Sequence, residues 1–277
     1  MSKARVMAHR RVQALHLGQA AVGAMLVMLA ASVPGRTQDL PAVPQDVPAS
    51  GLVHLRDVDA SILQDIRYAG ANNFTGRPVP GYAAAECLLL RDVAEALAQV
   101  QAELRKSRLS LQVYDCYRPR RAVRAFQAWV QEPESDPLLK RFYPSIDKGQ
   151  LMSLGYIASV SRHSRGDTVD LTLVALPSKP VPPFRRDAAY GTCAGPAGAR
   201  PPDKSLDMGT SFDCFDPLSH TAAPGLAAEH NQRRTLLVSA MAKQGFRNYE
   251  KEWWHFTHES PLRDTRSFDV PVTRRQH

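Results

Sequence analysis

The sequence lacks the short motifs that mark the commonest hydrolases and zinc modules. It has no His-Glu-x-x-His run, which excludes a protease of the thermolysin type. It also has no Gly-x-Ser-x-Gly run, so the nucleophile elbow of a serine hydrolase is missing. Its four cysteines show no Cys-x-x-Cys spacing, which excludes the usual structural zinc site.

Basic tracts interleaved with aromatic residues are absent too, so nucleic-acid binding is not indicated. The formal net charge is +8 over 277 residues. Four of the 35 Lys and Arg residues fall in residues 1–32, which contain no acid, and 31 basic against 27 acidic residues leaves +4 for the rest. Much of the positive charge therefore belongs to the N-terminal segment.

That segment has the pattern of a secretory signal peptide over residues 1–32. Basic residues precede an uncharged apolar stretch, Ala20 to Val33, and Ala30-Ala31-Ser32 offers small residues for cleavage. The apolar stretch is shorter than the roughly 20 residues that span a bilayer. We therefore expect an exported, periplasmic protein with no stable membrane anchor after cleavage, a proline-containing linker over 33–51, and one domain over 52–277.

An exported protein meets an oxidising compartment, so its four cysteines can form two disulfides. Three pairings are conceivable. We favour Cys193–Cys214, which would tie down a loop, together with Cys87–Cys116. The alternative is that all four are free buried thiols.

The spacing of apolar residues predicts an α+β domain. Helices are expected over 86–106, from Pro119 through Val130, and over 233–244, where Gly245 follows as a C-terminal cap. Strands are expected over 109–117, 170–176 and 249–258. Because helices and strands mix without regular βαβ alternation, we predict a small, mainly antiparallel sheet with helices packed against it.

Two local expectations accompany this fold. Alternation within the strand 109–117 places Leu111 and Val113, with Asp115, on one side. Residues 177–206 are rich in Pro, Gly and Arg and read as an irregular insertion, which we expect to be a solvated surface loop.

His163 and Asp170 frame a polar turn that leads into an apolar strand. A carboxylate at the start of such a strand is costly unless it is paired or binds a metal. The alternatives are a structural histidine at His163 and a salt bridge from Asp170 to a buried arginine.

The run Glu252-Trp-Trp-His255 repeats this chemistry near the C-terminus. Two imidazoles and one carboxylate make a catalytic zinc site with an open position, and Glu252 can serve as its base. On a regular strand, however, residues three apart face opposite ways. Both can reach one metal only if Glu252 precedes the strand or a bulge redirects it.

Arg118 ends one predicted strand and opens a helix. From there it could stabilise the oxyanion of a substrate carbonyl. The alternative is ordinary pairing with Asp115 or a surface carboxylate.

Seven ordered runs between about residues 55 and 270 resemble the VanX-type D-alanyl-D-alanine dipeptidases. They are Asp65-Ile-Arg-Tyr68, Asn73-Phe-Thr-Gly-Arg-Pro-x-x-Gly-Tyr82, Tyr114-Asp-Cys-Tyr-Arg-Pro119, Ser161-x-His-Ser-Arg-Gly-x-x-x-Asp-Leu-Thr-Leu173, Met208-Gly-x-x-Phe-Asp213, Asn231-x-Arg-Arg234 and Glu252-Trp-Trp-His255. The resemblance implies a fold shared with other zinc D,D-peptidases and the Hedgehog signalling domain.

The resemblance also implies a role for each matching residue. His163, Asp170 and His255 would bind one zinc ion per chain, Glu252 would be the general base, and Arg118 would assist the transition state. The residues that would line the pocket for a small D,D-dipeptide are Ser161, Asp213, Tyr68 and Tyr82, with Asp213 suited to the free ammonium group. Compact members of this family lack both the signal peptide and the insertion.

Three alternatives stay open. One is a D,D-carboxypeptidase that trims longer cell-wall peptides, and another is an L,L-dipeptidase. The third is a non-catalytic zinc-containing module that binds the wall, against which Glu252 argues because a binding module needs no base. The remaining histidines His220, His230 and His258 read as structural or exposed. The sequence indicates neither an oligomeric state nor a choice between wall recycling and glycopeptide resistance.

Overall fold

The structure is a computed structural model that describes residues 50–260 and 265–275. The predicted signal peptide, and nearly all of the predicted linker, lie outside these residues. No helix within the described ranges has the length and apolar character of a membrane span.

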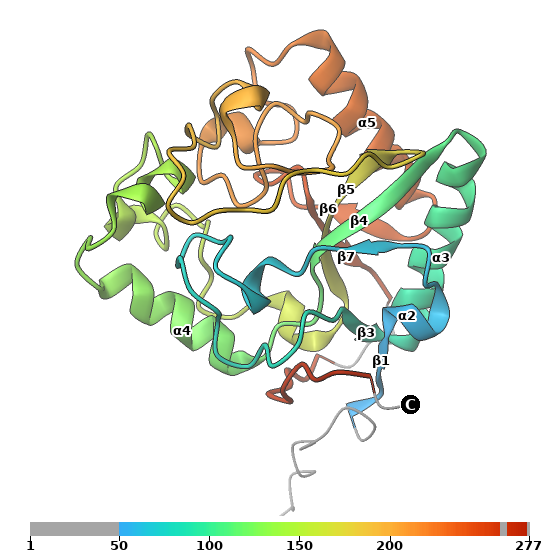
Figure 1. Cartoon of the computed structure of the whole chain (residues 1–277). Coiled ribbons are helices and arrows are strands. Elements are labelled where there is room, and N and C mark those ends of the chain that lie inside the picture. The colour runs from blue at the N-terminus through green and yellow to red at the C-terminus, as the bar shows by residue number, and fades with distance from the viewer. Residues whose placement is uncertain (1–49, 261–264, 276–277) are drawn as a thin grey trace, which may run out of the picture. The chain divides into compact units, whose positions relative to one another are not determined.

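A five-stranded sheet lies at the centre of the described chain (Figure 1). Its order is β2 (Leu63–Gln64), β4 (Leu109–Asp115), β5 (Thr168–Ala175), β7 (His255–His258) and β6 (Phe246–Asn248). The β2–β4 pair is parallel and the other neighbours are antiparallel. A separate antiparallel pair joins β1 (Leu52–His54) to β3 (Leu88–Leu90). The predicted α+β class is confirmed.

Four α-helices accompany these strands in the described residues: α2 (Leu55–Val58), α3 (Arg91–Lys106), α4 (Arg120–Gln131) and α5 (Ala228–Ala242). The short 3₁₀ helices are η1 (Arg67–Ala69), η2 (Pro137–Phe142), η3 (Lys148–Gln150), η4 (Arg162–Arg165), η5 (Ala197–Ala199) and η6 (Pro217–Ser219). Helix α3 packs on β4, and α5 packs on α3 and β5. In Figure 1, α3 and α4 lie on opposite sides of the strands.

Helix α3 buries the apolar face that the sequence predicts, with Val93, Leu97, Val100 and Leu104 all nearly inaccessible. It begins five residues later than predicted, because the preceding residues form strand β3 against β1 instead. Helix α5 differs in the other direction and begins at Ala228 rather than at residue 233. Pairing with a distant strand overrides local helical spacing at the first of these boundaries.

A bulge in β4 changes which face Asp115 occupies. Val113 pairs with Leu171, but Asp115 pairs with Asp170, so Tyr114 is an extra residue in the ladder. Directly paired residues point to the same face of a sheet. The predicted grouping of Asp115 with Leu111 and Val113 is therefore wrong, because the bulge turns Asp115 to the opposite face.

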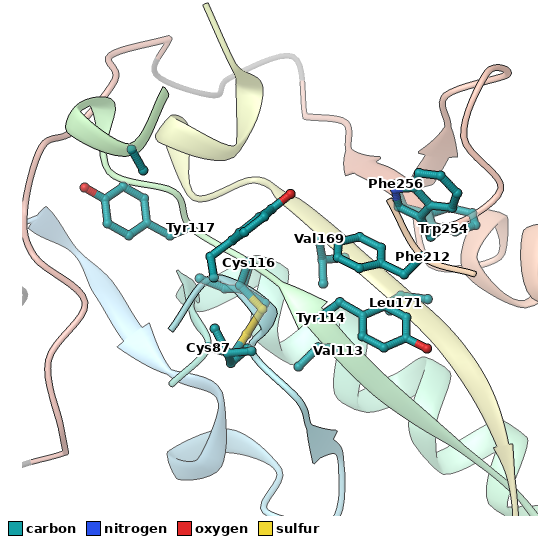
Figure 2. Close-up of a cluster of buried hydrophobic side chains, with 14 of the residues drawn as sticks. Cys87, Val113, Tyr114, Cys116, Tyr117, Val169, Leu171, Phe212, Trp254 and Phe256 are labelled. Carbon is teal, nitrogen blue, oxygen red and sulfur yellow. A yellow bond between two sulfur atoms is a disulfide. The ribbon is translucent and has the colours of Figure 1, made fainter. Parts of the chain in front are cut away.

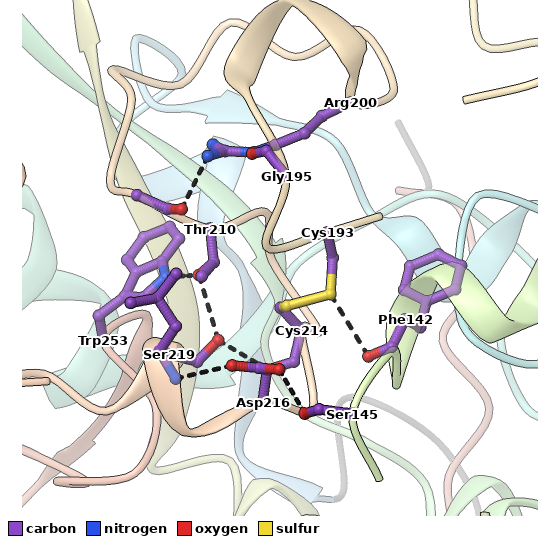
Figure 3. The surroundings of a disulfide bond; sticks show 12 residues. Phe142, Ser145, Cys193, Gly195, Arg200, Thr210, Cys214, Asp216, Ser219 and Trp253 are labelled. Carbon is purple, nitrogen blue, oxygen red and sulfur yellow. Dashed lines mark hydrogen bonds between the residues drawn. A yellow bond between two sulfur atoms is a disulfide. The ribbon is translucent and has the colours of Figure 1, made fainter. Parts of the chain in front are cut away.

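All four cysteines form disulfides, in the pairing that we favoured. Cys87–Cys116 lies within the buried hydrophobic cluster, near Val113 and Tyr117 (Figure 2). Cys193–Cys214 links the insertion to the segment that carries Asp213 (Figure 3). The two crosslinks fasten, respectively, the end of β4 to the segment before β3 and the insertion to the body of the domain.

The insertion is irregular, as predicted, with η5 as its one short helix among the described residues. It is not simply a solvated loop, however. Asp203 accepts hydrogen bonds from Tyr114 at 2.8 Å and Gln112 at 3.1 Å, and it forms a salt bridge with Arg67. The hydroxyl groups of Ser205 and Thr172 lie 2.6 Å apart. The end of the insertion therefore covers the face of β4 and β5 that also carries Asp115 and Asp170.

Candidate active site and metal centre

Strand register places three polar residues in one row across the sheet. Asp115 pairs with Asp170, and Asp170 pairs with His255, on the neighbouring strands β4, β5 and β7. Because paired residues share a face, the three side chains lie on the same side of the sheet. Asp115 and Asp170 are almost fully buried.

His163 reaches this row from the short helix η4. Gly166 ends that helix with a φ of +76°, and a Cβ at this position would overlap Leu52 Cδ2, so glycine suits the turn. His163 Nδ1 donates to the Cys116 carbonyl at 2.7 Å. This bond leaves the Nε2 lone pair free to bind a cation.

The three predicted ligands converge on one point. His163 Nε2 and His255 Nδ1 lie 3.3 Å and 3.0 Å from Asp170 Oδ1, and 3.3 Å from each other. Ligand atoms at the corners of a tetrahedron about 2.0–2.1 Å from zinc are about 3.3 Å apart. Asp170 Oδ1 is buried and makes no hydrogen bond of acceptable geometry. The donor set therefore fits a small divalent cation.

The protonation states agree with metal binding. Burial disfavours the charge of Asp170, but His163 and His255 outweigh it and lower the pKa of Asp170 below its usual range. Burial lowers the pKa of His255. An ionised carboxylate and a neutral imidazole are the forms that bind metals.

Glu252 lies in the turn before β7, not on the strand itself. The predicted strand over 249–258 is therefore too long, and the opposed facing of residues three apart does not arise. Glu252 Oε2 lies 3.5 Å from His255 Nδ1. Burial, together with the charges of Asp170 and Asp213, raises the pKa of Glu252 well above its usual range.

Arg118 makes the ion pair with Asp115 that the sequence offered as one alternative, and it also faces the cavity. It pairs with Asp115 at 2.9 Å, and its Nη2 also lies 3.6 Å from Asp170 Oδ2. Its guanidinium stacks over the rings of Tyr68 and Phe126, each 5.1 Å away. Arg118 lines the same cavity as the three predicted ligands.

Asp213 faces this cavity from a strained position. It is 4% exposed, and its φ is +57°. The Tyr68 hydroxyl lies 3.1 Å and 3.0 Å from its two carboxylate oxygens and donates a hydrogen bond. Burial raises the pKa of Asp213 well above its usual range, so a cation beside it would restore its charge.

The cavity has a volume of about 220 Å³ and contains eight of the nine predicted site residues. Ser161 lines it, but Tyr82 does not. The Tyr82 hydroxyl instead donates to Asp115 at 2.6 Å, behind the cavity wall. Tyr82 therefore contacts the site indirectly, through Asp115 and through the ring of Tyr68, whose centre lies 5.6 Å from its own.

Sequence reasoning did not assign a site role to Asp115, and it recognised only Tyr68 and Trp254 of the aromatic wall of the cavity. Asp115 accepts from both Tyr82 and Arg118, and it lies 3.4 Å from His163 Nδ1. Its position next to Arg118 in the sequence was a usable signal, but the bulge that turns it inward is not visible in the sequence. The aromatic residues lining the wall are Tyr68, Phe74, Phe126, Tyr156, Phe215, Tyr249 and Trp254.

A His-Asp-His cluster with an adjacent glutamate is typical of a metal-dependent hydrolase site. Comparison with known proteins gives the family. A family model described as D-ala-D-ala dipeptidase matches residues 48–179 and 202–273. The chain belongs to this family of M15 peptidases, and the unmatched residues 180–201 fall within the predicted insertion.

Curated relatives cover most of the chain. A D-alanyl-D-alanine dipeptidase of Enterococcus faecium is 33% identical over 222 residues, which are 80% of this chain and 98% of that protein. One from Streptomyces coelicolor is 36% identical, over 77% of this chain and 94% of its own length. One from Escherichia coli is 31% identical, over 74% and 83%.

We predict that the cluster binds one divalent metal ion per chain. Replacing His163, Asp170 or His255 by alanine should reduce the metal content, measured by mass spectrometry after dialysis, from one ion per chain to nearly none. His230 pairs with Asp207 and does not line the cavity, so His230→Asn is the control and should keep its metal. Full metal content in any of the three alanine variants would contradict the assignment.

Proposed function

We propose that this protein is a zinc-dependent D-alanyl-D-alanine dipeptidase that releases two D-alanines. The observation that carries the proposal is the meeting of the His-Asp-His cluster, Glu252 and Asp213 in one buried cavity. Membership of the D-ala-D-ala dipeptidase family supports the substrate, since the relatives carry that name. The donor set of two imidazoles and one carboxylate favours zinc.

His163, Asp170 and His255 would hold the metal, with a coordination position left for water or substrate. Zinc at such a site lowers the pKa of water and polarises a carbonyl oxygen. Cys116 supports this arrangement by holding His163 in one tautomer through its carbonyl. The buried sheet face fixes the other two residues through strand pairing.

Glu252 is the proposed general base. Burial raises the pKa of Glu252, which makes its carboxylate a stronger base that can accept a proton from water and return it to the leaving amine. Arg118 is the proposed partner of the developing oxyanion. Asp115 orients its guanidinium, and burial strengthens its field at the reacting carbonyl.

Asp213 is the proposed acceptor for the substrate ammonium group, with Tyr68 orienting it. A cavity of about 220 Å³ suits a substrate of dipeptide size. A peptide with an acylated amine would leave the buried Asp213 without a cation, which is costly. Ser161 is a further proposed contact for the polar groups of the substrate, since it also lines the cavity.

We further propose that the protein is exported to the periplasm. Two disulfides agree with an oxidising compartment, as does the signal-peptide pattern of residues 1–32. The domain boundaries of 33–51 and 52–277, and the Hedgehog-like form of the fold, stay predictions based on the sequence.

The first prediction for this proposal concerns substrate and metal together. Purified protein should hydrolyse D-Ala-D-Ala, lose that activity with a chelator and regain it when zinc is added back, as followed by D-alanine release. N-acetyl-D-Ala-D-Ala and L-Ala-L-Ala should be poor substrates. Faster cleavage of the acetylated peptide would identify a D,D-carboxypeptidase, and metal binding without hydrolysis of any of them would identify a binding module.

Glu252→Gln should leave folding and metal content intact and lower kcat by roughly two to four powers of ten, because the amide cannot accept the proton. Glu250→Gln is the matched control, since Glu250 is exposed two residues away, and it should keep normal turnover. Thermal unfolding and metal content measured in both variants separate a lost base from a lost fold. Normal kcat in Glu252→Gln would refute the assignment.

Asp213→Asn should lower kcat/KM for D-Ala-D-Ala by about 10- to 100-fold, because a neutral amide loses the charge that attracts the ammonium group. Asparagine tolerates the positive φ at this position, so the backbone should stay in place. The ratio of kcat/KM for the free and N-acetylated peptides is the decisive measurement. An unchanged ratio would show that Asp213 does not recognise the ammonium group of the substrate.

A further inference from the structure

Arg141, in η2, is a buried arginine that the proposed mechanism does not use. It is 7% exposed. Its guanidinium lies over the rings of Phe142, Phe184 and Tyr190, at 5.2, 5.4 and 5.7 Å from their centres. Phe184 and Tyr190 belong to the segment 180–201 that the family model does not match. The insertion therefore closes over Arg141.

Two of the three guanidinium nitrogens of Arg141 have no hydrogen-bond partner within the described residues. Its Nε and Nη1 are buried and make no hydrogen bond, and burial lowers its pKa. Aromatic faces attract the charge but accept N–H groups poorly. A buried charge in this condition is costly unless a counter-charge is present.

The other two buried arginines among the described residues are satisfied, whereas Arg141 lacks partners at two nitrogens; the half-buried Arg162 and Arg165 each lack one at Nε. Arg67 is 6% exposed and pairs with Asp65 and Asp203. Arg234 is 1% exposed and donates to the carbonyls of Met208, Leu218 and His220.

Arg141 lines a small cavity, where a second buried group also lacks a partner. Asn72 Oδ1 is buried in the wall and accepts no hydrogen bond. Rotating the Asn72 amide by 180° would turn its NH₂ group into the cavity as a donor. The accessible volume is about 10 Å³, which is room for one water-sized particle. This size excludes carboxylate, phosphate and sulfate groups.

We propose that this cavity binds a single halide ion, chloride under ordinary conditions, held by Arg141 Nε and Nη1 and by the rotated Asn72 amide. A water molecule would fit but would add no negative charge to that of Asp136, which also pairs with Arg186. The nearby carboxylates already have partners. Asp203 pairs with Arg67 and accepts hydrogen bonds from Gln112 and Tyr114, and Asp136 pairs with Arg186.

The halide site borders the segment that presents Asp213. Ser211 and Phe212 line the cavity, and Cys193 N donates to the Arg141 carbonyl at 2.8 Å. In Figure 3, Cys193 lies between Phe142 and Cys214, to which it is disulfide-bonded. Cys214 directly follows Asp213 in the sequence. An ion at Arg141 would therefore stiffen this segment. This effect on the site is the one part of the inference that rests on the proposed function. If that function holds, chloride should lower KM with little change in kcat.

The test uses bromide as an anomalous scatterer and is independent of activity. Crystals of the mature chain grown or soaked in sodium bromide should show an anomalous peak beside Arg141 Nε. The melting temperature should rise by about 3 °C when chloride replaces gluconate at constant ionic strength. Arg141→Met should abolish both effects. Arg185→Met, at an exposed residue of the same insertion that pairs with Asp187, should keep both.

Asn72→Asp keeps the test decisive if Arg141→Met fails to fold. A fixed carboxylate beside Arg141 replaces the ion, so this variant should fold, lose the bromide peak and have a melting temperature independent of chloride. Ordered water without anomalous signal in the parent protein would overturn the proposal. So would a chloride effect that persists unchanged in Asn72→Asp.

Discussion

The pairing register of β4, β5 and β7 is the constraint on which the site depends. It sets Asp115, Asp170 and His255 side by side on one face of the sheet. If one strand shifted its pairing by one residue, its polar side chain in this row would point to the opposite, apolar face of the sheet. Leu111, Val113, Leu171 and Leu173 are fully buried on that face, and their packing opposes such a slip. Hydrophobic packing on one face of the sheet thus positions the polar chemistry on the other.

Sequence reasoning recovered those parts of the site whose chemistry is local. His163 and Asp170 stand out because a tight turn joins them, and Glu252 and His255 because aromatic residues flank them. The role of Asp115 was not recovered, since it depends on an extra residue in β4 that alternation cannot reveal. The early strand β3 was missed for a similar reason, because its partner β1 lies over thirty residues away. Pairing between strands that are distant in the sequence determines both features. The periodic spacing of apolar residues indicates only the local preference for helix or strand.

The two disulfides act on different parts of the same site. Cys87–Cys116 holds the end of β4, where the Cys116 carbonyl fixes the tautomer of His163. Cys193–Cys214 holds the segment beside Asp213, whose positive φ the surrounding structure must maintain. Each crosslink thereby restrains a backbone group whose small displacement would matter more to the site than to the stability of the core.

Charge balance explains why four carboxylates can share one buried region. Asp115 has the guanidinium of Arg118, and Asp170 lies among the imidazoles that would share its metal. Asp213 faces the cavity that would receive the substrate ammonium group. Glu252 is the fourth, and among the described residues no arginine or lysine forms an ion pair with it. With a metal and a substrate in place, Glu252 would be the one carboxylate of the four without a cationic partner of its own. Burial, which raises its pKa, then favours its protonated form, as the proposed role of general base requires.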